Sequence, residues 1–151
     1  MLSPTLNKCR RPLLLASVSI WALIATSACT GLAAGPEAKA QLPVPASRDS
    51  AYVRARRAVQ AETFTLDMVD SSGGRLAGTR YPSANAKLGS GAACRVTVMM
   101  GIQGDAQQAN ITTTSRWVAP TRMSEQASQV CEQERAQVLE RITQTVVPPA
   151  K

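Results

Sequence analysis

The clearest pattern in the sequence is an alternation of apolar and polar residues over positions 63–69. In an extended chain this alternation places the apolar side chains on one face, which is typical of a half-buried strand. The Ser-Ser-Gly-Gly sequence at 71–74 favours a tight turn, so we expect residues 75–81 to form the second strand of a hairpin. The core-facing side chains predicted in the first strand are Phe64, Leu66 and Met68.

A second hairpin is predicted further along the chain. Cys94, Val96, Val98, Met100 and Ile102 occupy alternate positions, so Cys94 shares a face with the apolar residues. The turn is expected near 104–105, and the return strand over 110–118. The pattern does not decide which face of the return strand is buried. The two candidate faces are Ile111, Thr113, Ser115 and Trp117, or Thr112, Thr114, Arg116 and Val118.

Helical periodicity flanks the strands on both sides. Asp49 or Ser50 can cap a short helix that runs to about Ala61. A longer helix can begin at Thr121 or Ser124 and end near Thr145. Its apolar stripe contains Ala127, Cys131, Val138 and Ile142.

These elements predict one α+β domain over residues 49–147, followed by a tail at 148–151. The predicted order is α-β-β-β-β-α, with an antiparallel sheet of about four strands packed by both helices. Arg135 also falls in the apolar stripe of the second helix. We therefore expect its side chain to reach the edge of the core or to pair with an acid such as Asp67.

The first 28 residues have the layout of an export signal. Lys8, Arg10 and Arg11 are followed by an uncharged stretch of sixteen residues, 13–28, which is shorter than the roughly 20 residues of a membrane span. Small residues then lead directly into Cys29. In this feature the sequence resembles the bacterial lipoprotein class, although Thr26 stands where that class usually has Leu.

The lipoprotein resemblance implies that the thiol of Cys29 receives diacylglycerol and that this residue begins the mature chain. Because Thr30 rather than Asp follows it, the resemblance also implies the outer membrane, with the domain facing the periplasm. Residues 29–48 are then a lipidated N-terminus and a flexible tether rich in Ala, Gly and Pro, with a reach of about 50 Å. The alternatives are ordinary secretory cleavage, after Ala34 or Ala40, and an uncleaved anchor.

The cysteines agree with an oxidising compartment. Cys9 lies in the signal and Cys29 is the predicted lipid site, which leaves Cys94 and Cys131, 37 residues apart. We predict a structural disulfide between these two, contributing about 3 to 4 kcal/mol. Two separate thiols or a redox-active pair are the alternatives, but the spacing is not that of a C-x-x-C motif.

Composition narrows the range of functions. The 151 residues include no histidine, which excludes Ser-His-Asp and Cys-His catalysis and His-ligated zinc. We therefore predict a non-enzymatic protein with no catalytic residues, cofactor or metal. Removal of residues 1–28 leaves 14 Lys and Arg against 10 Asp and Glu, which lowers the formal charge from +7 to +4 and disfavours nucleic-acid binding.

The helix, strand, turn and strand over residues 52–80 resemble the helix-grip domains of some envelope lipoproteins, including the accessory lipoprotein of the outer-membrane β-barrel assembly machine. This resemblance concerns the fold, and the residues that carry it are Ala55, Ala58, Phe64, Leu66, Asp70, Gly74 and Leu76.

The expected function is that of a lipid-anchored periplasmic accessory or scaffold protein of an envelope assembly, with a membrane and an envelope protein as partners. The alternative is a module that binds cell-wall or anionic lipid ligands through the arginine-bearing helix or through the predicted loop at 83–93. Two interaction surfaces are candidates. Arg54, Arg56 and Arg57 form a basic cluster or a solvated helix face, and Trp117 is an interface anchor or a core residue.

Overall fold

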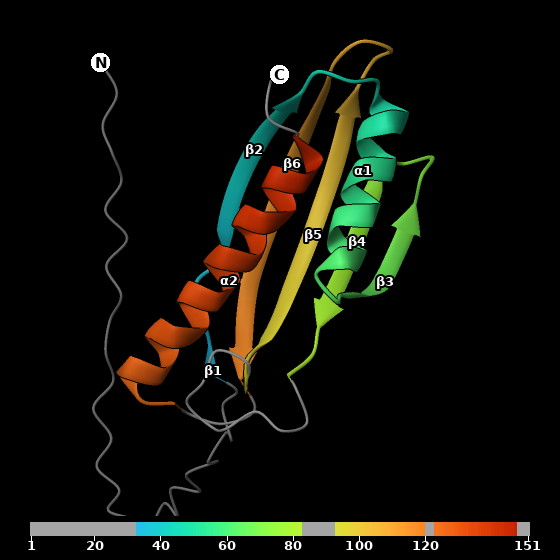
Figure 1. Cartoon of the computed structure of the whole chain (residues 1–151). Helices are drawn as coiled ribbons and strands as arrows, with labels where there is room; N and C mark the ends of the chain where they lie inside the picture. Colours follow the sequence, from blue (N-terminus) through green and yellow to red (C-terminus); the bar gives the residue numbers. More distant parts are fainter. Residues whose placement is uncertain (1–32, 83–92, 120–122, 148–151) are drawn as a thin grey trace, which may run out of the picture.

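The computed structural model describes residues 33–82, 93–119 and 123–147, which form one antiparallel sheet and two helices (Figure 1). Both helices pack on the same face of the sheet, and the buried side chains lie between the two layers. The predicted α+β class is confirmed. The strands are β1 (Ala33–Ala34), β2 (Ala38–Val44), β3 (Thr65–Asp70), β4 (Arg75–Arg80), β5 (Arg95–Gly104) and β6 (Ala109–Ala119).

The sheet has six strands among the described residues, not the predicted four. Its order is β1-β6-β5-β4-β3, and β2 also pairs with β6. Both additional strands lie in the segment expected to be a tether, so that expectation is wrong from Ala33 onward. Ala38, Ala40, Leu42 and Val44 alternate with Lys39, Gln41 and Pro43, which is a strand signal that the prediction of a tether left out. Pro43 is tolerated because an edge strand needs fewer donors.

The first hairpin forms as predicted, except at Met68. The register between β3 and β4 shifts between Leu66 and Met68, which makes a β-bulge at Asp67. One extra residue in a strand reverses the faces of those that follow. Met68 is therefore 43% exposed, whereas Phe64, before the bulge, is buried.

The second hairpin connects β5 and β6, with the last pair at Gly104 and Ala109. The structure decides which face of β6 is buried. Ile111, Ser115 and Trp117 point toward the helices, and Thr112 and Arg116 are exposed on the other side.

Each helix begins after a serine cap. The hydroxyl of Ser47 accepts a hydrogen bond from the Ser50 N–H at the start of α1 (Arg48–Ala61). The hydroxyl of Ser124 accepts one from the Ala127 N–H at the start of α2 (Glu125–Val146). Both caps satisfy N–H groups that have no partner within the helix. The predicted caps of the first helix, Asp49 and Ser50, are wrong, because α1 begins two to three residues earlier after Ser47. Of the two predicted starts of the second helix, Ser124 is confirmed as the cap of α2.

Candidate functional site

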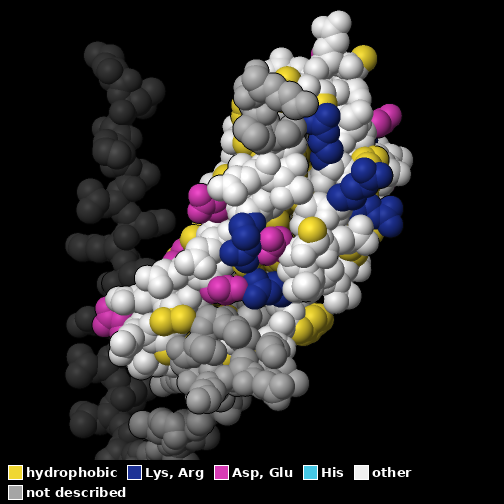
Figure 2. Space-filling model, in the orientation of Figure 1, with side chains coloured by type: hydrophobic (Ala, Val, Ile, Leu, Met, Phe, Trp, Pro, Cys, Tyr) yellow, Lys and Arg dark blue, Asp and Glu magenta, His cyan; other side chains and the backbone are white. Residues whose placement is uncertain are grey.

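The predicted arginine cluster lies on the outer side of α1. Figure 2 shows Lys and Arg side chains gathered over this helix. Arg56 and Arg57 are exposed and Arg54 is half-buried, while Ala55 and Ala58 face the core. None of the three arginines forms an ion pair within the described part of the chain. Arg54 and Arg57 line a shallow hollow of about 370 Å³, but Asp49 also lines it.

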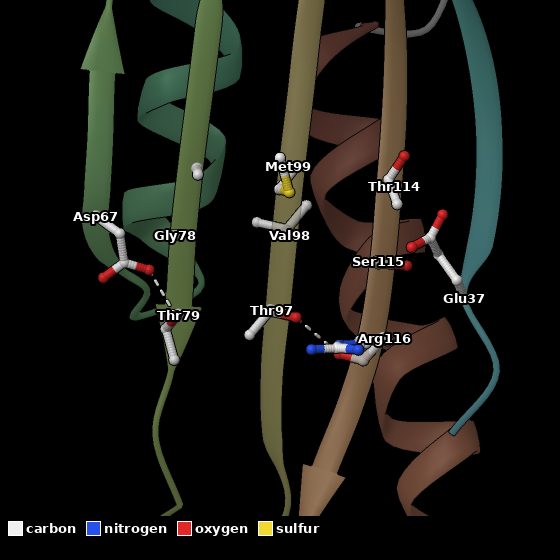
Figure 3. A pocket seen from close by; sticks show the side chains of 11 residues that line it. Glu37, Asp67, Gly78, Thr79, Thr97, Val98, Met99, Thr114, Ser115 and Arg116 are labelled. Carbon is white, nitrogen blue, oxygen red and sulfur yellow. Dashed lines mark hydrogen bonds between the residues drawn. The ribbon is translucent and has the colours of Figure 1, made fainter. Parts of the chain in front are cut away.

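The second candidate surface is the sheet face that no described helix covers, which we call the helix-free face. Figure 3 shows this face with the helices behind the strands. Its side chains come from the positions that alternate with the core residues: Met68, Ala77, Thr97, Met99, Gly101, Thr112, Thr114 and Arg116.

Two adjoining hollows lie on the helix-free face. One has a volume of about 420 Å³ and extends to Glu37 and Asp67, and the other, of about 280 Å³, extends to Met68. They share Ala77, Met99 and Thr114. Met99 is 58% exposed, so an apolar side chain stands between two concave areas. Such an arrangement suits contact with an apolar group of a partner.

Polar groups at the border of the helix-free face are engaged with one another. The Thr79 hydroxyl donates a 2.5 Å hydrogen bond to Asp67 at the β3 bulge. The Thr97 hydroxyl donates to the carbonyl of Arg116 at 3.3 Å, and Glu37 pairs with Lys39 at 3.3 Å. These polar groups at the border therefore have partners within the chain.

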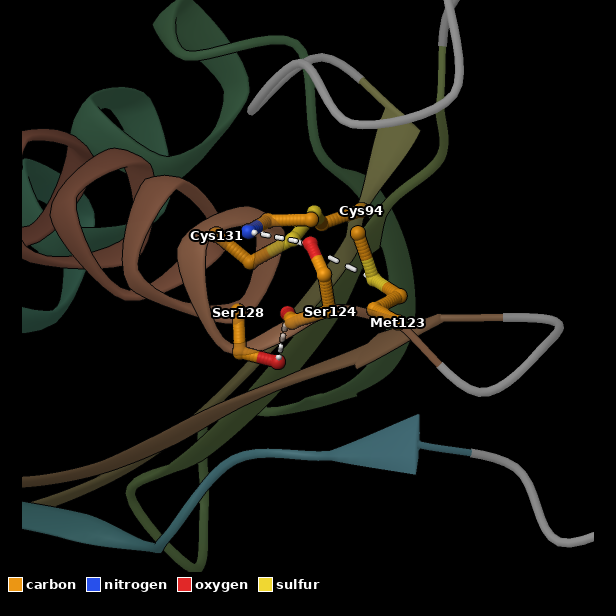
Figure 4. The surroundings of a disulfide bond; sticks show 6 residues. Cys94, Met123, Ser124, Ser128 and Cys131 are labelled. Atoms are coloured by element: carbon orange, nitrogen blue, oxygen red, sulfur yellow. Dashed lines mark hydrogen bonds between the residues drawn. A yellow bond between two sulfur atoms is a disulfide. The ribbon is translucent and has the colours of Figure 1, made fainter.

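The predicted disulfide between Cys94 and Cys131 is present (Figure 4), with Cα atoms 5.8 Å apart. It joins the chain just before β5 to the second turn of α2. The sulfur of Met123 lies 3.8 Å from the sulfur of Cys131, and both cysteines are buried. These surroundings are those of a structural crosslink between sheet and helix.

Arg135 is buried, and its partners differ from the predicted one. Its Nε donates a 3.0 Å hydrogen bond to Glu132, one turn earlier on α2, and its Nη1 donates to the hydroxyl of Ser115 at 3.0 Å. The predicted partner, Asp67, lies on the helix-free face instead. The hydrogen bonds and charge of Arg135 lower the pKa of Glu132 below its ordinary value. This cluster holds α2 against β6.

The other perturbed carboxylates serve turns. The Gly73 N–H and the Ser72 hydroxyl donate to Asp70 and lower its pKa. The N–H groups of Gln107 and Gln108 lower the pKa of Asp105 in the same way. Among the residues that the structure describes, no three His, Cys, Asp or Glu side chains are grouped as metal ligands.

Trp117, the remaining candidate for an interaction surface, is 3% exposed and belongs to the core. The N–H of Gly35 donates to its carbonyl at 3.0 Å, and a side chain at Gly35 would overlap the indole. Cys29 and most of the predicted 83–93 loop lie outside the described residues. Within the described ranges, no helix is both long enough and apolar enough to cross a membrane.

No protein-family model and no curated protein matches this sequence. Solved structures, in contrast, include similar folds. The chain is similar to Ara h 8.0201, with a TM-score of 0.51 over 76% of this chain and 98% of that one, at 7% identity. It is also similar to a point mutant of norcoclaurine synthase from Thalictrum flavum, with a TM-score of 0.47 over 77% of this chain and 96% of that one, at 9% identity. The first similarity supports the fold alone.

Sequence reasoning missed the helix-free face as a candidate site. The alternation in β5 and β6 does assign Met99, Thr112 and Thr114 to one side, but it does not say whether a further layer covers that side. Met68 was predicted to point the other way, because a bulge leaves no clear signal in a single sequence. The hollows around Met99 therefore appear only when four strands are placed together.

Proposed function

We propose that this protein is a lipid-anchored accessory or scaffold protein of a bacterial envelope assembly, facing the periplasm from the outer membrane, and that it binds a partner protein through the helix-free face. The support for the anchor is the signal-like segment that ends at Cys29. The support for the binding surface is the exposed Met99 between two hollows.

The partner surface is expected to be apolar at its centre and polar at its rim, in the manner of protein interfaces. Met68 and Met99 are 43% and 58% exposed, and flexible methionine side chains adapt to the shape of a partner. The neighbouring Thr112 and Thr114 offer hydroxyl groups on the same face. A non-enzymatic role is proposed because the sequence contains no histidine, the commonest general base.

The test is site-specific photo-crosslinking in cells that naturally produce the protein. A crosslinking amino acid at position 99 should yield a discrete adduct with one envelope protein. The same amino acid at Gln60, which is exposed on α1, is the matched control and should not yield that adduct. The Met99→Glu substitution should then reduce recovery of the identified partner at least tenfold. Equal adducts at both positions, or none at position 99, would count against the proposal.

The arginine cluster supports the alternative function, a module that binds anionic lipid or cell-wall ligands. Reversal of Arg54, Arg56 and Arg57 to Glu should abolish sedimentation with such ligands if this function holds. Arg75→Glu is the control, because the Arg75 side chain is exposed and lines a hollow of the helix-free face, on the other side of the sheet from the arginine cluster. Unchanged sedimentation of the triple variant would rule out the cluster as the binding surface.

A further inference from the structure

We propose that the end of the sheet that carries β1 rests on the membrane surface, with Tyr81, Arg95 and Arg116 against phospholipid headgroups. This inference rests on the proposed lipid at Cys29 and adds to it an orientation and a contact surface.

The first step is that the chain is part of the domain from residue 33 onward. Ala33 pairs with Ala119, and Ala34 pairs with Val118, at the end of β6. The next residue, Gly35, is held by its hydrogen bond to the Trp117 carbonyl and lies directly against the indole. The predicted tether is therefore shortened to the residues that precede β1.

The second step is the length of the segment that remains between Cys29 and β1. Only residues 30–32 separate Cys29 from Ala33, and four fully extended peptide units span at most about 14 Å. A lipidated cysteine lies at the boundary of the hydrocarbon, beneath a headgroup layer of about 5 to 8 Å. The length left over is too short to lift the β1 end far from the headgroups, in contrast to the 50 Å expected from the sequence.

The third step is the chemistry at the β1 end. Arg95 pairs in register with Val118, and Arg80 with Val96, so both arginines lie at the same end of the sheet as β1. Arg80 is engaged with Glu134, but Arg95 and Arg116 form no ion pair with any described residue. Arg116 is exposed, whereas Arg95 is half-buried with its Nε buried, so the outer part of its guanidinium would make the contact. Tyr81 follows β4 and is 59% exposed. Arginine and tyrosine are side chains that favour the membrane interface.

Carboxylates also lie at this end. Glu134 and Glu132 are engaged with Arg80 and Arg135, and Glu37 pairs with Lys39. Glu125, in the first turn of α2, is exposed and is not in an ion pair within the described ranges. Asp67, which lines a hollow together with Arg116, is not in an ion pair with any described residue either. The proposed contact therefore depends on individual hydrogen bonds from arginine to headgroup phosphates and not on net charge. The opposite end of the sheet, at Gly104, lies about 30 Å away along β5.

The experiment uses the membrane-extracted protein, reconstituted in vesicles of phosphatidylethanolamine and phosphatidylglycerol. Intact mass first establishes whether Cys29 carries acyl groups. Lipids brominated near the headgroup then quench tryptophan fluorescence in two variants, Tyr81→Trp and Gln103→Trp. Gln103 is exposed at the opposite end and is the matched control, and the buried Trp117 gives the background of the wild type.

We expect quenching of Tyr81→Trp to exceed the wild-type background at least twofold, and Gln103→Trp to remain at background. Reversal of Arg95 and Arg116 to Glu should lower the quenching of Tyr81→Trp by about half, and Arg75→Glu, at the other end, should leave it unchanged.

An acylated protein in which both tryptophans are quenched equally, or neither is, would overturn the orientation and leave the anchor standing. A mass without acyl groups at Cys29 would overturn both proposals. Quenching that survives reversal of Arg95 and Arg116 but disappears on reversal of Arg54, Arg56 and Arg57 would assign the contact to α1 and overturn the proposed surface.

Discussion

Met99 and Met100 are neighbours in β5, but they lie in two very different environments. Met100 points toward the helices and is 5% exposed, whereas Met99 lies on the helix-free face and is 58% exposed. The same contrast continues along the strand, where Val96, Val98 and Ile102 are buried and the residues between them are not. One sheet therefore has a face that forms the core and a face that no described helix covers.

The contrast indicates that the helix-covered face stabilises the fold, while the helix-free face is available for binding a partner. Close packing makes the helix-covered face sensitive to the loss of even a methyl group. The helix-free face contributes its backbone to the sheet, but most of its side chains contact solvent. Its composition can therefore suit a partner at little cost in folding free energy. Four predictions test this division, beginning with the largest effect.

The disulfide that links α2 to the chain before β5 should make the largest contribution to the free energy of unfolding. Cys94→Ser and Cys131→Ser should each lower the free energy of unfolding by about 3 to 4 kcal/mol, because the unfolded chain loses a 37-residue loop. The double variant should lose little more than either single one, as measured by urea unfolding. Losses that add fully would show that the two thiols act separately.

The methionine pair compares the faces directly. Met100→Ala should lower the free energy of unfolding by about 2 to 4 kcal/mol, because a cavity remains between the sheet and the helices. Met99→Ala should change it by less than about 0.5 kcal/mol. Chemical denaturation of the two variants gives the comparison, and similar losses would mean that Met99 is covered in solution.

A pair of glycines tests the same division with an added methyl group. Gly35→Ala should destabilise the domain by about 1 to 3 kcal/mol, because a side chain there overlaps the indole of Trp117. Gly101, on the helix-free face, has open space at the corresponding position. Gly101→Ala should therefore be neutral or stabilising by about 0.5 kcal/mol in thermal unfolding. If Gly35→Ala left the stability unchanged, Gly35 would not be packed against Trp117, and the prediction of a flexible tether at this position would hold.

The smallest effect is expected from pH. Because Arg135 lowers the pKa of Glu132 in the folded state, this pair stabilises the domain above the unfolded-state pKa, and the contribution disappears as the pH falls through the lower, folded-state value. Glu132 is partly exposed, so screening limits the contribution to about 0.5 kcal/mol. Glu132→Gln should lose less stability than the wild type on acidification below about pH 4.5. Parallel curves would exclude this contribution.

Local patterns predicted much of the fold. Three features depend only on residues close together in the chain, so a single sequence shows them. They are the alternation around Val96 and Val98, the glycine turn before Arg75 and the serine before α2. The bulge at Asp67 could not be predicted in this way, since it depends on the register with β4. The acidic partner of Arg135 could have been predicted, because Glu132 lies one helical turn away at the i,i+3 spacing. Its second partner could not, because Ser115 meets Arg135 only when α2 packs on β6.

The sequence by itself determined the class of the domain, the two central hairpins, both helices and the cysteine pair, because periodicity, turn residues and thiol parity are properties of the chain. The tertiary structure decided which face of the sheet stays open, where Trp117 lies and whether residues 33–44 belong to the domain. Residues 33–44 join the domain by pairing with β6. This pairing must outweigh the conformational entropy that the segment would keep if it were free. The residues of β6 that provide the pairing lie more than sixty positions away in the sequence, so the local pattern of residues 33–44 could not show the outcome.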